Sequence, residues 1–283
     1  MERHAVRIDA HQHFWRLADR AGAWPPPTLA PIHRDFGPDD LAPLLQASGV
    51  DGTVLVQSLP RVAETRALLA QARATSFVRG VVGWVDMKAA DAADTVAELA
   101  RDPLLKGLRP MLQDLADDDW IADPATAPAA EAMARHGLVF DALVLPRHLR
   151  ALRIFANRHP GLAIVVDHAA KPPIARGRTQ PWRDDLARLA ELPQVHCKVS
   201  GLLTEAGDNT RLEDLLPWFQ ALWASFGPSR LLWGSDWPVL RLAGDYAGWL
   251  ATTLDLLAAV HPPASEAERA AFLGANAAIL YRL

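Results

Sequence analysis

Short runs of apolar residues alternate with longer amphipathic segments along almost the whole chain. Each short run has the length of a strand, and most are rich in Val, Ile and Leu. Near-continuous apolar strands of this kind are typical of a parallel sheet that is covered on both faces. The pattern predicts eight strands, at residues 7–10, 52–57, 78–85, 106–112, 138–144, 163–168, 195–200 and 231–235.

The segments between these strands have the apolar period of helices and are rich in Ala, Leu and Arg. Several carry helix start or stop signals, such as Asp39 before the first, Gly49 after it and Gly137 after the fourth. The predicted helices lie at residues 39–47, 63–74, 90–101, 127–136, 147–159, 182–192, 212–226, 246–260 and 265–280. Strand and helix alternating eight times favours a closed (β/α)8 barrel, one domain over residues 1–283, rather than an open doubly wound sheet.

Composition agrees with a barrel and narrows the class of partner. The chain has 283 residues, half of them hydrophobic, and a (β/α)8 domain takes about 250 residues. The net charge is -4, and the 29 Lys and Arg residues are scattered, so we expect neither a nucleic acid nor a membrane as partner. The N-terminus lacks a secretory signal pattern, and the single cysteine, Cys197, cannot form an internal disulfide. We therefore expect a cytoplasmic protein that acts on a small molecule; oligomeric state is left open.

Polar residues mark the ends of the first and last predicted strands. His11 and His13 stand at positions i and i+2, so in a strand their imidazoles point to the same side. Asp236 follows the last predicted strand and can reach that spot only if the sheet closes into a barrel. A single histidine at a strand end is more often structural than functional, but two beside a carboxylate reverse this expectation. The arrangement predicts a site at the carboxyl ends of the strands.

Four motifs carry a family resemblance: DAHQHFW at residues 9–15, VDHAAKP at 166–172, HCKVSGL at 196–202 and GSDWPV at 234–239. In order and spacing they resemble the amidohydrolase superfamily and, within it, the branch of sugar-lactone hydrolases. The resemblance spans residues 7 to about 280. It implies a lactonase that opens a sugar-acid lactone, such as L-fuconolactone. It also implies that Asp236 is the base that activates water, and that His11, His13 and His168 stabilise the oxyanion.

Further candidates could recognise the sugar. Polar side chains near the ends of apolar strands are expected to line the pocket of a barrel; they are Gln57, Arg109, Lys198 and Ser200. Indole rings at or just after strand ends can pack on a sugar ring; they are Trp15, Trp24, Trp84 and Trp237. The alternatives are an ion pair of Arg109 with Asp114 or Asp141, solvation of Lys198, and ordinary packing of the indoles. Strand alternation predicts that Asp167 and His168 point to opposite faces.

The candidate metal ligands of this chain differ from the fuller superfamily pattern, because the fifth predicted strand offers Asp141 and no histidine. His11, His13 and Asp236, with His168 as a possible fourth ligand, could hold a single divalent ion, for which zinc is the best candidate. A lactone needs less activation than an amide, so the ion need not be required. Two alternatives stay open: a metal-dependent amidase or decarboxylase, and a barrel that binds a sugar acid without turnover.

Overall fold

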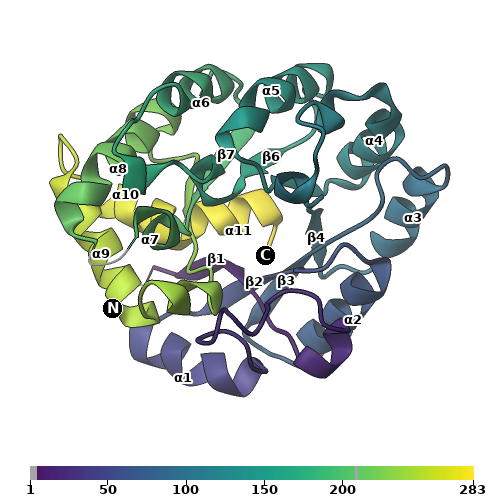
Figure 1. The fold of residues 1–283 in the computed structure, drawn as a ribbon, viewed down its shortest axis with the longest axis horizontal. Coiled ribbons are helices and arrows are strands. Elements are labelled where there is room, and N and C mark those ends of the chain that lie inside the picture. The colour runs from purple at the N-terminus through teal and green to yellow at the C-terminus, as the bar shows by residue number, and fades with distance from the viewer. Residues whose placement is uncertain (1–4, 208–209) are drawn as a thin grey trace.

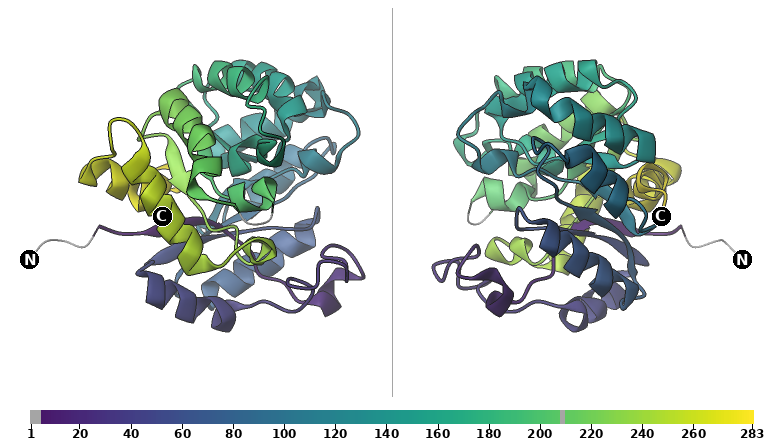
Figure 2. Two further views of the ribbon diagram at one scale, coloured as in Figure 1. Left: turned by 60° about the vertical axis from the view of Figure 1, so that its left-hand side comes forward. Right: turned by 90° about the vertical axis from the view of Figure 1, so that its right-hand side faces the viewer.

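Eight parallel strands form one sheet in the order of the chain, from β1 to β8. The structure is a computed structural model, and it describes residues 5–207 and 210–283. Figures 1 and 2 show the helices as an outer layer around the strands. The strands are β1 (Ile8–Gln12), β2 (Gly52–Val56), β3 (Val78–Gly83), β4 (Leu105–Leu108), β5 (Val139–Ala142), β6 (Ile164–Val166), β7 (Val195–Val199) and β8 (Leu231–Trp233).

The sheet closes between its first and last strands. The backbone N–H of His13 donates to the carbonyl oxygen of Trp237 at 2.8 Å, and the N–H of Asp236 donates to the carbonyl oxygen of His11 at 2.8 Å. Gln12 and Trp237 form a parallel bridge just beyond β8. The predicted (β/α)8 barrel is thereby confirmed, and its closure brings together motifs from opposite ends of the sequence.

Most of the helices pack their apolar faces on the outside of the sheet. Helix α1 begins with Pro38 at a position where the missing N–H costs nothing, and Gly49, which follows its last residue, has the left-handed conformation. The helices are α1 (Pro38–Ser48), α2 (Val62–Arg73), α3 (Ala92–Leu99), α4 (Ala127–His136), α5 (Leu149–Arg158), α6 (Trp182–Ala190), α7 (Leu202–Ala206), α8 (Leu212–Phe226), α9 (Tyr246–Ala259), α10 (Glu266–Ala270) and α11 (Asn276–Tyr281).

The core has two parts. The larger lies between the sheet and the surrounding helices, and the smaller fills the barrel with side chains such as Ala10, Val54 and Val165. Helix α11 crosses the middle of the ring in Figure 1, and its Ala277 and Tyr281 belong to the inner cluster. The barrel is thus a packed solid beneath its site and not a pore.

Some predicted boundaries were wrong, for local reasons. Strand β4 ends at Leu108 and not at residue 112, because Pro110 has no N–H to donate to a neighbouring strand. Strand β6 ends at Val166, where the backbone enters a left-handed turn. Helix α7 lies within the predicted loop 201–211, of which residues 208–209 are outside the described part. Among the described residues, none of the helices is both long and apolar enough to cross a membrane; the cytoplasmic location stays a prediction.

Candidate active site

A cavity of about 500 Å³ opens at the carboxyl ends of the strands. Its wall is partly apolar, with Leu29, Leu143 and Val239 on several different loops. The polar side chains that share this cavity include His13, Ser58, Arg109, Gln113, Asp114, His168, Lys171, Thr204, Glu205 and Asp236. Three of the four predicted catalytic residues therefore border one space, and the fourth, His11, lies directly behind them.

The first and last strands bring two imidazoles and a carboxylate into contact. The Nε2 atoms of His11 and His13 are 3.2 Å apart. Oδ1 of Asp236 is 3.3 Å from Nε2 of His13 and 3.7 Å from Nε2 of His11. Asp236 holds a left-handed conformation, with φ of 58°, which aspartate tolerates better than most residues. These contacts depend on barrel closure, since the backbone hydrogen bonds from His13 to Trp237 and from Asp236 to His11 join β1 to the segment that follows β8.

The proton positions in this cluster follow from its neighbours. Nδ1 of His13 lies 2.7 Å from the carbonyl oxygen of Val56, so Nδ1 carries a proton and donates it to that oxygen. Burial lowers the pKa of His11 well below its ordinary 6.5, although Asp167 opposes that shift. Nδ1 of His11 lies 3.4 Å from Asp167 and 3.3 Å from the Lys198 ammonium, and its Nε2 lies 3.3 Å from the Arg109 guanidinium. The Nε2 atoms of both imidazoles and the Asp236 carboxylate therefore converge on one point.

Three such ligand atoms can hold a proton or a cation between them. The three ligand-atom separations of 3.2, 3.3 and 3.7 Å are close to the edge of about 3.4 Å expected for a tetrahedron with bonds of roughly 2.1 Å. His11, His13 and Asp236 form one possible ligand group, and His11, Asp167 and His168 form another. The donors therefore fit one divalent ion of the zinc type, and Asp167 is a candidate ligand that the sequence did not indicate.

His168 reaches the site by an unusual backbone path. After β6, residues 168 to 171 all have positive φ, at 52°, 51°, 60° and 50°, although none of them is glycine. The prediction that Asp167 and His168 point to opposite faces was wrong, because this left-handed turn replaces the strand. Nε2 of His168 is 3.9 Å from Asp236, while Asp167 contacts His11. Nδ1 of His168 is 2.8 Å from Oγ of Ser200, which fixes the ring.

Burial sets the charge of these groups. It lowers the pKa of His168 to about 4, against the opposing effect of Asp236 and Asp167. For Asp236, burial raises the pKa, but the surrounding histidines outweigh it and hold the pKa below the ordinary 3.8. At neutral pH the site therefore combines a neutral His168 with an ionised carboxylate.

A second group of charges lies deeper in the barrel. The Lys198 ammonium is fully buried and pairs with Asp141 and with Asp167, the latter at 3.1 Å. The hydroxyl of Tyr281 on α11 also donates to Asp141, at 2.7 Å. Lys198 therefore does not border the cavity, in contrast to its predicted contact with substrate. Its Nζ lies 3.3 Å from Nδ1 of His11, so it acts on the site through that ring.

The other predicted polar residues divide between the cavity wall and its support. Arg109 borders the cavity, and its Nη1 lies 3.3 Å from Nε2 of His11 and 3.4 Å from Asp167. Gln57 is buried. Its backbone carbonyl oxygen accepts from the Arg109 guanidinium, and its side-chain amide donates to the backbone carbonyl oxygen of Arg109. Gln57 and Ser200 thus hold Arg109 and His168 in place. Neither of the proposed ion-pair partners of Arg109, Asp114 and Asp141, is the one found.

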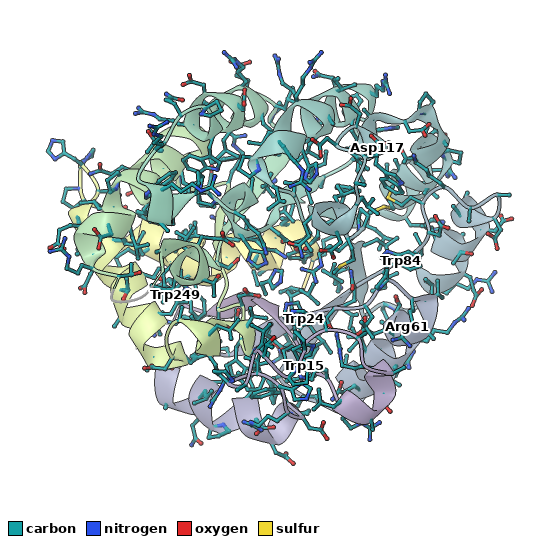
Figure 3. The ribbon with its side chains drawn as sticks, viewed as in Figure 1. Trp15, Trp24, Arg61, Trp84, Asp117 and Trp249 are labelled. Atoms are coloured by element: carbon teal, nitrogen blue, oxygen red, sulfur yellow. The ribbon has the colours of Figure 1, made fainter. Side chains whose placement is uncertain are left out.

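The four predicted tryptophans do not share one place. Trp24 borders the cavity and is 37% exposed, and Figure 3 shows it near the middle of the ring, next to Trp15. Trp15 is buried and lines a neighbouring cavity. Trp237 is buried against Phe14 and Phe36. Trp84 lies toward the outside of the ring in Figure 3. Only Trp24 of these four is placed to contact a ligand in this cavity.

Sequence reasoning missed several residues of the site. Lys171 and Glu205 border the cavity; Lys171 stood in a quoted motif, and Glu205 lies on the unpredicted helix α7. Arg20 is buried, donates to Ser58 at 3.0 Å and to the carbonyl oxygen of Trp24, and lies 3.6 Å from Glu64. It fixes the loop that carries Trp24. No local pattern indicates these contacts. The one weak signal is the presence of an arginine inside the Pro-rich loop after the first strand.

A family model for amidohydrolases matches residues 8–283. The chain is 57% identical over 280 residues to an L-fucono-1,5-lactonase of Burkholderia ambifaria, covering 98% of this chain and 96% of that protein. It is 39% identical to an L-fucono-1,5-lactonase of Burkholderia multivorans, covering 99% and 97%. A crystal structure of an amidohydrolase from Burkholderia multivorans with bound zinc is 38% identical, covers 99% of this chain and 100% of that one, and has a TM-score of 0.89.

Proposed function

The chain belongs to the amidohydrolase family, and we propose that it is a lactonase that hydrolyses a sugar-acid lactone, with L-fucono-1,5-lactone as the first substrate to test. Two relatives at 57% and 39% identity, each matched over nearly its whole length, are L-fucono-1,5-lactonases. Membership of the family and hydrolysis of a sugar lactone were both predicted from the sequence, and both are confirmed. The observation within the site that carries the proposal is the ionised Asp236 close to the neutral His168 at the edge of the cavity.

In the proposed reaction Asp236 is the general base. Its carboxylate takes a proton from a water molecule as the water oxygen bonds to the lactone carbonyl carbon. The tetrahedral intermediate then collapses, and the bond from the carbonyl carbon to the ring oxygen breaks. Asp236 returns its proton to that ring oxygen, which leaves as a hydroxyl group. The product is an open-chain hydroxy acid, and its carboxylic acid releases one proton to solvent at neutral pH.

His168 and Arg109 supply donors for the developing oxyanion. The Ser200 hydroxyl faces Nδ1 of His168 at 2.8 Å; when it donates, the ring proton is on Nε2, which faces the cavity. The Arg109 guanidinium borders the same space and is fixed by Gln57. Donors that are held in position before the reaction stabilise the transition state without reorganisation. His11 and His13 lie beside Asp236, with their Nε2 atoms 3.7 and 3.3 Å from its Oδ1.

We assign the possible metal site to His11, His13 and Asp236, with zinc as the best candidate. A divalent ion bound there would polarise the carbonyl and lower the pKa of a bound water. Asp236 also serves as base in our proposal, so the ion is not required for every step. We expect exhaustive treatment with a chelator to lower kcat/KM by less than about tenfold, well below the 10²-fold typical of a lost general base. A complete loss that zinc alone restores would contradict this expectation.

A pH-indicator assay with the purified protein tests the function directly, because each ring opening releases one proton. We expect turnover of L-fucono-1,5-lactone and of lactones that share its ring hydroxyls. N-acyl amides and aromatic carboxylates serve as the comparison, since the same fold supports amidases and decarboxylases. Turnover of those substrates without turnover of any aldonolactone would overturn the proposal. Tight binding of a sugar acid without turnover would favour a binding protein instead.

A further inference from the structure

We propose that Lys171 and Glu205 form a subsite that reads the ring hydroxyls of the substrate. The inference rests on the proposed lactonase function and extends it to specificity. Both side chains border the cavity that contains His13, His168 and Asp236. Lys171 lies on the loop after β6, and Glu205 lies on α7 after β7, so adjacent strands of the barrel supply the two groups.

The backbone is distorted in a way that brings Lys171 to the cavity. Residues 168–171 form one left-handed turn, closed by a hydrogen bond of 2.8 Å from the N–H of Lys171 to the carbonyl oxygen of His168. Non-glycine residues avoid this conformation, and strained backbone gathers where function requires it. The turn is held from outside, because Ala169 and Ala170 are buried and the Trp182 indole donates to the Ala169 carbonyl at 2.7 Å.

The same distortion fixes the position of Glu205. Gly201 precedes α7 with φ of 66°, and a Cβ at this position would lie 2.9 Å from Nδ1 of His168. A glycine here lets α7 approach the His168 turn closely. The first strained turn carries His168 and Lys171, and the tight junction beside it carries Glu205. The catalytic histidine and the pair of charges are therefore placed by two backbone segments that pack against each other.

The spacing of the pair suits a ligand between them better than a direct bond. Nζ of Lys171 lies 4.0 Å from Oε1 of Glu205, and the two side chains are 27% and 28% exposed. This distance is longer than a hydrogen bond, so both groups keep capacity for a third partner. Burial raises the pKa of Glu205, although Lys171 opposes that shift and Asp236 adds to it. The two half-buried groups do not bond each other directly, so both are available to a ligand in the cavity that they border.

A ring hydroxyl matches these two groups chemically. The ammonium donates to the hydroxyl oxygen, and the carboxylate accepts the hydroxyl proton, so one hydroxyl or two adjacent ones can satisfy both. A site built to bond a hydroxyl rejects an analogue that lacks it, because its polar groups are then left without partners. The pair therefore discriminates among sugar lactones, while Asp236 and His168 act on the carbonyl that all lactones share.

The test compares protein variants with substrate variants. We measure kcat and KM of the wild type, Glu205→Gln and Lys171→Met with L-fucono-1,5-lactone and with its three analogues that each lack one ring hydroxyl. We expect each variant to lose about 10- to 100-fold in kcat/KM with the parent lactone, the range for a hydrogen bond to a charged group. With the analogue that lacks the recognised hydroxyl, the loss should shrink at least fivefold. Glu191→Gln, in a surface pair with Arg153 at 3.7 Å, is the matched control and should behave as the wild type.

Three results would overturn the subsite while leaving the lactonase intact. An equal loss with all four lactones would make Glu205 or Lys171 a general structural or acid-base group, and no loss with any lactone would remove the pair from recognition. A loss of activity with every lactone, together with a lowered thermal midpoint of the variant, would indicate a folding role. If Lys171→Met does not fold, Lys171→Asn replaces it, because asparagine tolerates the left-handed conformation. A wild type that hydrolyses none of the lactones would instead overturn the proposed function.

Discussion

Two clusters of charged and polar side chains lie at different depths of the same barrel. The upper cluster, His13, His168 and Asp236, borders the cavity. The deep cluster, Asp141, Asp167 and Lys198, is fully buried. His11 touches both, through Nε2 toward Asp236 and through Nδ1 toward Asp167. The two clusters are built from similar residue types, yet they leave very different possibilities for chemistry.

The difference is one of how completely the charges are paired. In the deep cluster Lys198 contacts both carboxylates, and Tyr281 supplies a further donor to Asp141. In the upper cluster the close neighbours of Asp236 are imidazoles, and burial keeps one of them, His168, neutral. A paired buried cluster positions its neighbours, whereas a single carboxylate with free capacity can accept a proton. The geometry of each cluster, and not its residue types, therefore decides which cluster supports the structure and which can act on a substrate.

Asp236→Asn is the sharpest test of the upper cluster. The amide keeps the shape of the carboxylate but cannot take a proton from water, so we expect kcat to fall by at least about 10²-fold. Urea unfolding should show little change in stability. Asp114→Asn, a substitution of the same kind on the wall of the same cavity, serves as control and should lose less than about tenfold. An active Asp236→Asn enzyme would remove the base from the proposed mechanism.

Lys198→Met tests the deep cluster. Removal of the ammonium leaves Asp141 and Asp167 buried without their main partner, and breaking a buried pair in this way costs about 3–5 kcal/mol. The free energy of unfolding in urea measures the loss. Lys106→Met is the control, because the Lys106 ammonium donates to the Arg282 carbonyl from a more exposed position, and it should cost much less. A Lys198→Met protein that is as stable as the wild type but has a raised KM would return Lys198 to substrate contact.

The pH profile gives a smaller effect that reports on His168. Burial lowers its pKa to about 4, so the neutral form that the mechanism needs persists well below the ordinary 6.5. We expect kcat/KM to stay level from pH 8 to pH 6 and to fall near pH 4. Between 6.5 and 4 the unfolded chain binds a proton that the native site does not, so this residue lowers stability as the pH falls. An activity loss centred at 6.5 would show that His168 titrates as an ordinary histidine.

The fold was largely predictable because it rests on periodicity. Apolar runs placed all eight strands, and His11, His13 and Asp236 could be assigned to one site once closure was assumed. Side-chain direction after a strand was not predictable. Asp167 and His168 should alternate in a strand, but a left-handed turn of non-glycine residues turns both toward the site. Glu205 depends on that same turn, and a local pattern carries no information about it.

Closure of the barrel also has a consequence for how the protein is made. The imidazoles stand on β1 and the carboxylate follows β8, separated by more than two hundred residues of chain. During vectorial synthesis the ribosome releases β1 long before β8 exists, so a nascent chain holds both histidines without their partner. Hydrolytic activity is then an all-or-none signal of completed assembly. A refolding experiment that records turnover would report the joining of β1 to β8, whereas circular dichroism would register helices formed earlier.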